Sequence, residues 1–366
     1  MDGVALTAAD AAAATESSPV VLPLRGAAYA GALPSAGVAR GTAIEVTTGA
    51  MLPPGTDCVI PHERLGAPLP PQGEPVAVIV QPPQRGEFVA PADDLVRKGA
   101  PLAQPGTVVT PALVGVLASC GWPALHVVRR PQVALMPTGD ELVALGSTLG
   151  PGQVFGSNVY ALDALVTSLG GGESQVHPPI PDELPAVEAA LLDVAARADL
   201  VVTIGGSGRS RRDHVGTAVG ALGSSLAHGL AVRPGASTLL GTLRAGGGTS
   251  VPLVGLPGHP AAASLIACVL VVPAVRALGG MPPWQPQSLL APLAAPLRAE
   301  PGVHQLILAR RTQEGSLQPL ERSVGDYWGF LQSEGIIQMP PGTPSLARGQ
   351  MVSLELWPQL WRNEAR

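Results

Sequence analysis

Three short apolar runs between residues 130 and 280 each end in a glycine-containing turn. The turns read TGDEL at 138–142, IGGSGRSRRD at 204–213 and GLPGHP at 255–260. Apolar runs of this length, bounded by turns, predict buried parallel strands. Because the carboxyl ends of parallel strands meet at one edge of a sheet, the turns and their carboxylates are expected to gather there, where α/β proteins hold phosphorylated ligands and their metals. The expected fold class is α/β, with a mostly parallel sheet.

The 366 residues exceed one ordinary core, and their pattern changes along the chain. Residues 1–130 contain short β-type runs between Pro/Gly turns and predict a β-rich N-terminal region with one helix near residues 110–120. Residues 131–280 alternate strands and helices and predict a central three-layer α/β domain. Beyond a Pro-rich joint at 279–287, residues 288–366 predict a small C-terminal β domain.

The expected elements follow from these patterns. In the first region they are strands at 20–24, 42–46, 57–61 and 76–80. In the second they are strands at 133–137, 199–206, 230–234, 237–243 and 251–258, and helices at 157–170, at 181–198, from 213 onward, and from 259 or 260 to about 278. In the third they are antiparallel strands at 304–311, 315–320, 335–340 and 350–357.

Composition excludes several classes of function. Only 13% of residues are charged, the net charge is −5, and there is no basic stripe, so we expect no nucleic acid partner. The longest apolar run, at 265–275, is about half of the roughly 20 residues that cross a bilayer, so we expect a buried helix and no membrane span. The three cysteines form no CxxC pair, which argues against a disulfide frame or zinc site. No secretory signal is visible, so we expect a cytoplasmic location.

The first turn is a candidate metal and phosphate site. Thr138 and Gly139 end the strand, and Asp140 and Glu141 then project beyond the sheet edge. Mg²⁺ takes hard oxygen ligands, usually one or two carboxylates together with substrate phosphates and water. A solvated turn that starts a helix is an equally good interpretation of this pentapeptide alone.

The second turn is a candidate anion site. Glycines here allow positive φ and a close backbone approach to an anion, and arginines add forked donors suited to phosphate. The residues concerned are Gly205, Gly206, Ser207, Gly208, Arg209, Arg211 and Arg212. The alternative is a solvated loop whose Asp213 caps the following helix.

The third turn and two upstream segments complete the candidates. Gly258 frees the backbone, and Pro260 presets the first helical turn. We interpret the His259 side chain as a surface cap. Upstream, MDGVA and TTGAMLPPGTDCVIPHE contain Asp2, Asp57 and Glu63, which are turn residues unless the fold places them opposite the sheet edge. The sequence has no Ser-His-Asp arrangement, Walker lysine loop or zinc-binding helix.

The order of these motifs resembles one family, the molybdopterin molybdenumtransferases, known as MoeA in bacteria and as the gephyrin E domain in animals. MDGVA is similar to the family's MDGYA, PTGDELVALGSTLGPGQVFGSN to its TGDELxxxGxxLxxGQIxxSN, and GLPGHP to its LPGNP turn. The segments at 47–63, 181–191 and 204–215 follow in the family's order. The resemblance covers essentially the whole chain.

This resemblance implies that the chain inserts molybdate into adenylated molybdopterin and releases AMP in the presence of Mg²⁺. It further implies a homodimer whose active cleft lies between subunits. The implied catalytic residues are Asp2, Asp57, Glu141, Asp182 and Asp213. The implied metal ligands are Asp140, Glu141 and Asp213. The implied substrate-binding residues are Thr138, Gly139, Asp140, Gly205, Gly206, Ser207, Arg209, Arg211, Arg212, Arg233, Pro257, Gly258 and Pro260.

The sequence departs from the family pattern in four places, one of which is His259 where LPGNP has Asn. Family members carry several tens of residues ahead of MDGYA, whereas this chain starts at that Met, so we expect an upstream start or an altered dimer. GGVSVGxxD has become GGSGRSRRD. PGKP is PGAS at 234–237, which removes a lysine at Ala236 while Arg233 supplies a cation. We hypothesise that the three arginines of the second turn take over the lysine's phosphate contact, in which case their removal weakens nucleotide binding more than removal of Arg25.

Two other functions remain open. One is a divergent molybdopterin-binding or carrier protein with little insertase activity, which the altered second turn favours. The other is a different enzyme on the shared molybdopterin-binding domain, such as a nucleotide amidohydrolase of the competence-damage type. The motifs at 1–5 and 47–63 count against the amidohydrolase, since such a relative would not supply them.

Overall fold

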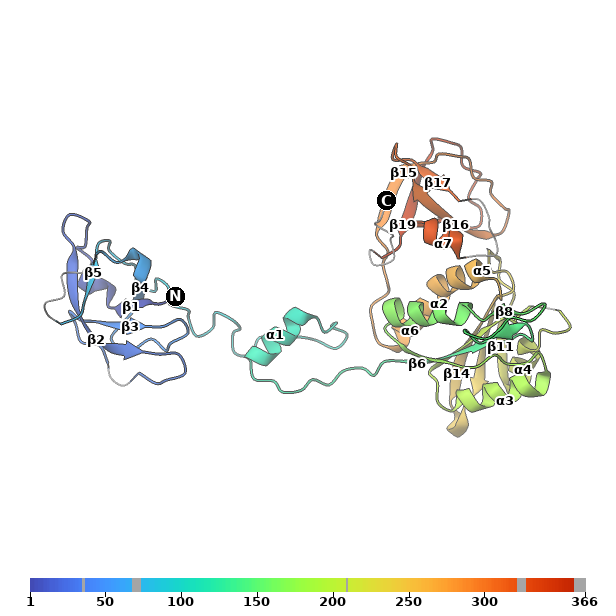
Figure 1. Cartoon of the computed structure of the whole chain (residues 1–366), viewed down its shortest axis with the longest axis horizontal. Helices are drawn as coiled ribbons and strands as arrows, with labels where there is room; N and C mark the ends of the chain where they lie inside the picture. Colours follow the sequence, from blue (N-terminus) through green and yellow to red (C-terminus); the bar gives the residue numbers. More distant parts are fainter. Residues whose placement is uncertain (35–36, 68–73, 209, 321–326, 359–366) are drawn as a thin grey trace. The chain divides into compact units, whose positions relative to one another are not determined.

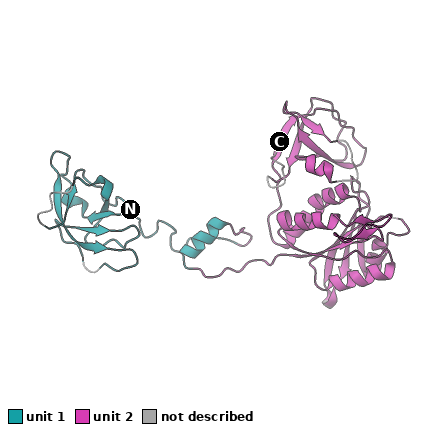
Figure 2. Cartoon of the chain, viewed as in Figure 1, with its two compact units in different colours: residues 1–104, 111–121 teal, residues 105–110, 122–366 magenta. Residues whose placement is uncertain are grey.

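The chain divides into two compact units, each with its own buried apolar clusters (Figures 1 and 2). The computed structural model describes residues 1–34, 37–67, 74–208, 210–320 and 327–358. The first unit comprises residues 1–104 and 111–121, and the second comprises residues 105–110 and 122–366.

The first unit is built on a five-stranded sheet of order β4-β1-β3-β2-β5. Its strands are β1 (Gly3–Leu6), β2 (Val20–Ala28), β3 (Ala43–Val46), β4 (Cys58–Pro61) and β5 (Val76–Ile79). All four runs predicted as strands lie in this sheet, and β1 is an addition. Helix α1 (Pro111–Ser119) forms where a helix was expected, and none of its residues is buried.

The second unit contains the α/β domain, whose six-stranded sheet has the order β11-β13-β14-β10-β6-β9. Its strands are β6 (Gln132–Pro137), β9 (Glu173–Val176), β10 (Leu200–Ile204), β11 (Gly223–His228), β13 (Leu239–Arg244) and β14 (Ser250–Leu256). Strands β14, β10, β6 and β9 run parallel, whereas β13 pairs antiparallel with both β14 and β11. The prediction of a mostly parallel sheet is confirmed. The two edge strands β9 and β11 were missed because their polar residues give no apolar run.

Helices cover both faces of this sheet (Figure 1). One face packs against two helices. The first is α2 (Asn158–Leu165), which continues into a π-helical turn (Val166–Gly170). The second is a long helix made of α5 (Pro260–Ile266), a π-helical turn (Ala267–Val271) and α6 (Val272–Leu278). The other face packs against α3 (Leu184–Ala195) and α4 (Val215–Leu222). In β10, Leu200 and Val202 belong to the first layer's core and Val201 to the second, as strand alternation requires. The three-layer prediction is confirmed.

The long helix Pro260–Leu278 is apolar and long enough to cross a membrane by length and composition alone. Most of it is buried, and Leu265, Ile266 and Val271 lie in the core against the sheet. This agrees with the expected buried helix.

Two helices begin later than predicted. Helix α3 begins at Leu184 and α4 at Val215, whereas starts at 181 and 213 were expected. The Asp213 carboxylate accepts a hydrogen bond from the N–H of Ser210 in its own turn, so it does not cap α4. The N–H of Asp182 donates to Asp140 Oδ1 in the neighbouring turn, so Asp182 belongs to the segment that precedes α3.

The C-terminal domain, also in the second unit, has a sheet of order β12-β16-β18-β19-β15, with β17 paired to β16. Its elements are β12 (Val232–Arg233), β15 (Ser288–Pro292), β16 (His304–Arg311), β17 (Leu317–Pro319), α7 (Trp328–Gln332), β18 (Gly335–Met339) and β19 (Met351–Leu356). The run at 230–234 was expected to belong to the α/β domain. That expectation was wrong, because β12 pairs in parallel with β16. Leu306, Ile336 and Trp357 join the core beneath α2 and α5, so the two domains share buried surface.

A charged contact fixes the entry to β6. Both guanidinium nitrogens Nη1 and Nη2 of Arg129 donate to Asp199, at 2.7 and 2.8 Å, and the backbone N–H of Gln132 donates to the same carboxylate at 2.7 Å. The hydrogen bond from Arg129 is the main reason that the pKa of Asp199 lies below its ordinary value. Asp199 precedes β10 and Gln132 opens β6, so the contact joins the starts of two neighbouring strands.

We expect Asp199→Asn to destabilise the second unit by about 1–2 kcal/mol at pH 7, because charge-assisted hydrogen bonds are stronger than neutral ones. The folded-state pKa of Asp199 is depressed below the ordinary value of 3.8, so its stabilisation is present above that pH and is lost as the pH falls through the folded pKa. Urea denaturation of the wild type and the variant should differ at pH 7 and converge below pH 3.8. A difference that stays constant into that acidic range would contradict the assignment.

Candidate active site

Three strands of the central sheet end at the same level. Ile204 at the end of β10 is in register with Pro137 of β6 on one side and with Leu256 of β14 on the other. The hydrogen-bond ladder then continues into the turns, since the N–H of Thr138 donates to Ile204 O at 2.9 Å and the N–H of Gly205 donates to Leu256 O at 3.0 Å. The three predicted turns are therefore brought together at one edge of the sheet.

The second turn requires glycine at two positions. Gly205 and Gly206 have φ values of +90° and +61°, a region that other residues rarely adopt. A Cβ on Gly205 would lie 2.7 Å from Thr138 O, and one on Gly206 would lie 2.7 Å from Thr138 Oγ1. Thr138 Oγ1 is buried and makes no hydrogen bond with any described residue. The turn thus lies directly against the end of the neighbouring strand and leaves no space for side chains.

Acids from two separate segments meet beside this turn. The N–H of Asp182 donates to Asp140 Oδ1 at 3.0 Å, and Arg212 Nη1 lies 4.0 Å from Asp140 Oδ2. Burial is the main cause that raises the pKa of Asp182, and the negative charges of Asp140 and Glu141 raise it further. We call Asp140, Glu141, Asp182 and Arg212 the acid cluster. The expected convergence of these residues at the strand ends is observed.

Asp213 has a different position from the one expected for a metal ligand. Its Oδ2 accepts a hydrogen bond of 2.6 Å from the N–H of Ser210, and it lies so close to Gly208 that a Cβ there would be 2.7 Å away. In the described part of the chain, no three His, Cys, Asp or Glu side chains are grouped as a metal site. The predicted set of Asp140, Glu141 and Asp213 is therefore not preassembled, because Asp213 holds its own turn.

The acid cluster nevertheless fits Mg²⁺. Mg²⁺ commonly uses one or two carboxylates and completes its coordination with phosphate oxygens and water. Asp140 and Glu141 are both solvent-accessible, and their charge already raises the pKa of the neighbouring Asp182. A cation beside them would relieve that repulsion.

The third turn is held by residues that the sequence analysis did not select. Asn158 Nδ2 donates to Gly258 O at 2.7 Å, and the Tyr327 hydroxyl donates to Asn158 Oδ1 at 2.8 Å. Asn158 lies in the segment quoted for the family resemblance, so its motif was a usable signal. Tyr327 lies 169 residues further along the chain, and no local pattern links it to the site.

His228 is a second residue that the sequence analysis missed. Its Nε2 lies 3.0 Å from both Ser207 O and Gly208 O, and its ring packs against α4, where a Cβ on Gly216 would be 2.7 Å from it. The peptide bonds after Ser207 and Gly208 are therefore oriented by one imidazole. Arg211 is exposed at the surface of this turn. Arg209 lies outside the described residues.

A cleft of about 820 Å³ opens between the α/β domain and the C-terminal domain. Pro257 and His259 line it from the α/β domain, and Arg233, Arg298 and Gln305 line it from the C-terminal domain. Arg233 Nη1 pairs with Glu300 Oε2 at 2.9 Å. Pro257 and His259 belong to the third turn, so the cleft adjoins the strand-end site. Pro260, in the same turn, begins α5.

Asp2 and Asp57 lie in the first unit. Thr48 donates to Asp2 Oδ1 through its N–H at 2.7 Å and its hydroxyl at 2.9 Å, and the N–H is the main reason that the pKa of Asp2 is lowered. Asp57 Oδ1 accepts from the N–H of Ala8 at 2.7 Å, and Arg85 lies 3.7 Å from Oδ2. Because β1 and β4 are antiparallel, the two acids flank opposite ends of this strand pair, about 16 Å apart at 3.3 Å per residue. The first unit does not bring them together.

Comparisons with known proteins agree with the geometry. Residues 1–121 match the model of the MoeA N-terminal region (domain I and II), and residues 134–277 match that of a probable molybdopterin binding domain. The molybdopterin molybdenumtransferase of Nostoc sp. is 32% identical over 78% of this chain, and the match spans 64% of that protein, less than two thirds of its length. Molybdopterin molybdenumtransferase 2 of Mycobacterium tuberculosis is 29% identical over 98% of this chain and 87% of that protein.

A solved structure has a similar fold. The molybdopterin biosynthesis MoeA protein of Pyrococcus horikoshii is 28% identical, with a TM-score of 0.79 over 97% of this chain and 86% of that one. Two domain models, curated relatives and a structural neighbour thus agree on one assignment. The chain belongs to the molybdopterin molybdenumtransferase, or MoeA, family of transferases in molybdenum cofactor biosynthesis.

Proposed function

We propose that this chain inserts molybdate into adenylated molybdopterin and releases AMP. The observation that supports this most is the meeting of three turns at one sheet edge, where Arg212 lies 4.0 Å from Asp140 and the buried Thr138 Oγ1 has no hydrogen-bond partner among the described residues. Such an edge is the common place for a phosphorylated ligand in an α/β fold. The printed names of the relatives supply the chemistry that this site would perform.

In this proposal the second turn binds the phosphates. Gly205 and Gly206 have positive φ and pack against Thr138, which lets successive backbone N–H groups of this turn point toward one anion. Arg211 and Arg212 contribute positive charge from the same turn. His228 keeps the peptide bonds after Ser207 and Gly208 in one orientation, so the turn need not reorganise when the ligand arrives.

Asp140 and Glu141 are the residues that would hold Mg²⁺. When bound there, the ion neutralises phosphate charge and favours attack at phosphorus. Asp182 accepts a hydrogen bond from the attacking water. The water oxygen bonds to the phosphorus on the pterin side and gives its proton to Asp182, the anhydride P–O bond breaks, and AMP leaves with that bond's electron pair. A catalytic role for Asp2 and Asp57, which lie in the first unit, rests on the family resemblance alone.

The proposed place for the substrate molybdate is the cleft between the two domains. Arg233 and Arg298 line it, and both carry permanent positive charge that suits an oxyanion. The cleft adjoins the third turn through Pro257 and His259, so molybdate and the nucleotide would be bound in contiguous space. Arg233 here supplies the cation that the PGAS sequence lacks at Ala236.

We expect the purified chain to release AMP from adenylated molybdopterin when molybdate and Mg²⁺ are present. Asp140→Asn should lower that rate by on the order of 100-fold, because it removes charge that acts in a preorganised site. The matched control is Asp193→Asn, an exposed carboxylate on α3 paired only with Arg197 among the described residues. Binding of the nucleotide without AMP release would favour the carrier alternative, and equal rates for the two variants would reject the assigned role.

We expect replacement of both Arg211 and Arg212 with alanine to weaken binding of the adenylated substrate by about 10- to 100-fold, the effect of losing charge-assisted contacts to phosphate. Arg348→Ala is a suitable control in the same unit, because Arg348 is exposed and outside the site. Arg25 is less suitable, since it pairs with Glu74 at 2.6 Å. Calorimetric titration measures the difference, and equal affinities for the double variant and the control would contradict the phosphate role.

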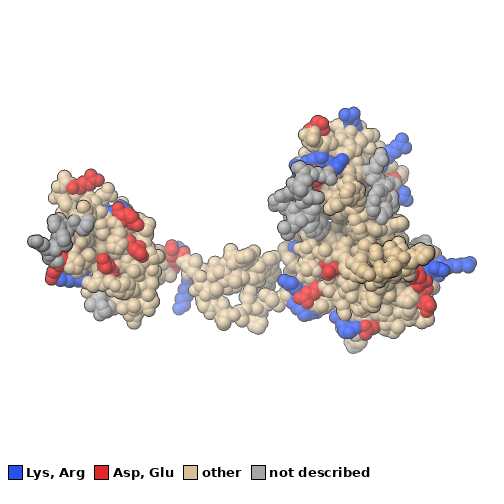
Figure 3. Space-filling view, in the orientation of Figure 1, with Lys and Arg blue, Asp and Glu red and all other residues tan. Residues whose placement is uncertain are grey.

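We also propose a homodimer, with the segment 105–130 as part of its interface. This segment contains no Lys, Arg, Asp or Glu before Arg129, and its face in Figure 3 is uncharged. Val114 in α1 and Trp122 and Val127 beyond it are 52%, 63% and 66% exposed, and contiguous exposed apolar surface of this kind marks protein interaction sites. Light scattering should give twice the chain mass of 37.0 kDa. A monomer that remains monomeric at high concentration would exclude this interface.

A further inference from the structure

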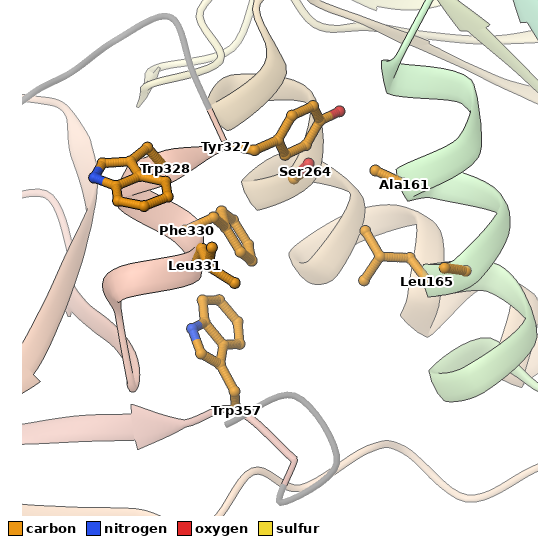
Figure 4. A pocket seen from close by; sticks show the side chains of 9 residues that line it. Ala161, Leu165, Ser264, Tyr327, Trp328, Phe330, Leu331 and Trp357 are labelled. Atoms are coloured by element: carbon orange, nitrogen blue, oxygen red, sulfur yellow. The ribbon is translucent and has the colours of Figure 1, made fainter. Parts of the chain in front are cut away.

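A second pocket lies away from the charged residues of the site, between α2, α5 and α7 (Figure 4). Its volume is about 420 Å³. Leu165 lines it from α2 and Ser264 from α5, while the C-terminal domain contributes Tyr327, Trp328 and Trp357. The pocket is therefore formed by both domains of the second unit.

The pocket concentrates the chain's aromatic side chains. Aromatic residues make up only 3% of the sequence, yet four of them surround this one pocket. Phe330 and Trp357 stack with ring centroids 4.8 Å apart and an interplanar angle of 19°. Trp357 is 2% exposed, and its Nε1 donates to Ser333 Oγ at 2.8 Å, so this pair is a fixed surface. Trp328 is 62% exposed and forms the open side.

One polar group inside the pocket has unused hydrogen-bonding capacity. Ser264 is 2% exposed, and its Oγ lies near the Tyr327 hydroxyl but makes no hydrogen bond of good geometry with a described residue, so it can still accept one from a ligand. Leaving a buried hydroxyl unsatisfied is costly in an otherwise apolar site. A ligand that stacks on the aromatic rings and offers a ring nitrogen or amino group to Ser264 would satisfy it. In Figure 4 the Ser264 oxygen faces the space beside Tyr327.

The pocket is joined to the strand-end site by hydrogen bonds. Tyr327 donates to Asn158, which donates to Gly258 O in the third turn. Ala161 lines the pocket one helical turn after Asn158, and Ser264 lines it one turn after Pro260. The pocket thus begins one helical turn beyond the turn that belongs to the phosphate site.

We propose that this pocket binds a planar nitrogen heterocycle, namely one ring end of the substrate whose phosphates lie at the three turns. The shared chemistry is a flat ring with hydrogen-bonding nitrogens, which both adenine and a pterin provide. Stacking on Phe330 and Trp328 supplies affinity, and Ser264 supplies the polar contact. The identity of the ring rests on the proposed function. The existence of a ring-binding site is argued from the pocket alone.

The test is calorimetric titration of the full chain with AMP and, separately, with a free pterin. We expect at least one of them to bind, and Trp328→Ala to weaken that binding by at least about fivefold, the lower end of ring-stacking contributions. Tyr29→Ala is the matched control, because Tyr29 is an aromatic residue that is 60% exposed and does not line the pocket. The arm that responds to Trp328→Ala identifies which ring of the substrate occupies the site.

Ser264→Ala keeps the test valid if the tryptophan variant folds poorly. Removing an unpaired buried hydroxyl should leave the thermal midpoint unchanged or higher, yet weaken binding of the ring about threefold or more, as loss of a hydrogen bond does. Neither the AMP titration nor the pterin titration requires molybdate insertion. The binding result can therefore be interpreted even if the chain releases no AMP. Absence of binding by both compounds, or equal affinities for Trp328→Ala and Tyr29→Ala, would overturn the ring site.

Discussion

The in-register ends of β6, β10 and β14 determine the rest of the site. Pro137, Ile204 and Leu256 stand side by side, and backbone hydrogen bonds continue one residue beyond them into the turns. A slip of one residue in any of these strands would displace its turn by about 3.3 Å and reverse the faces of its side chains. The burial of both faces of β10 prevents such a slip, since each face packs into a different core. Register is therefore what makes three separate turns into one site.

At this edge of the sheet, one arginine offsets part of the negative charge of the neighbouring aspartates. Asp182 is held against Asp140 by its own backbone N–H, which fixes two like charges near each other. Their repulsion is moderated by Arg212 at 4.0 Å, a distance that leaves the guanidinium able to turn toward a phosphate. A site of this kind is complementary to a ligand that carries both anionic oxygens and a metal ion, because neither charge alone satisfies all of its groups.

The parts of this site that follow local rules could be predicted from sequence. TGDEL, the glycine turn and GLPGHP each follow an apolar run, and both features are readable within about ten residues of chain. His228 and Tyr327 could not be found in this way, because their contacts lie 20 and 169 residues away in the chain. Asp2 and Asp57 show the same limit. The sequence identifies both as acidic residues, but the antiparallel pairing that puts them at opposite ends of β1 and β4 depends on tertiary structure.

The strand β12 shows how a short, misassigned element affects the site. Its two residues pair with β16, so Arg233 is positioned by the C-terminal sheet although it lies in the chain between two strands of the central sheet, β11 and β13. The ion pair with Glu300 offsets part of the charge of Arg233. Arg298 lines the same cleft and adds a second positive charge. Two arginines and one paired carboxylate give the cleft a net positive charge, which suits an oxyanion although Ala236 stands where the family pattern has a lysine.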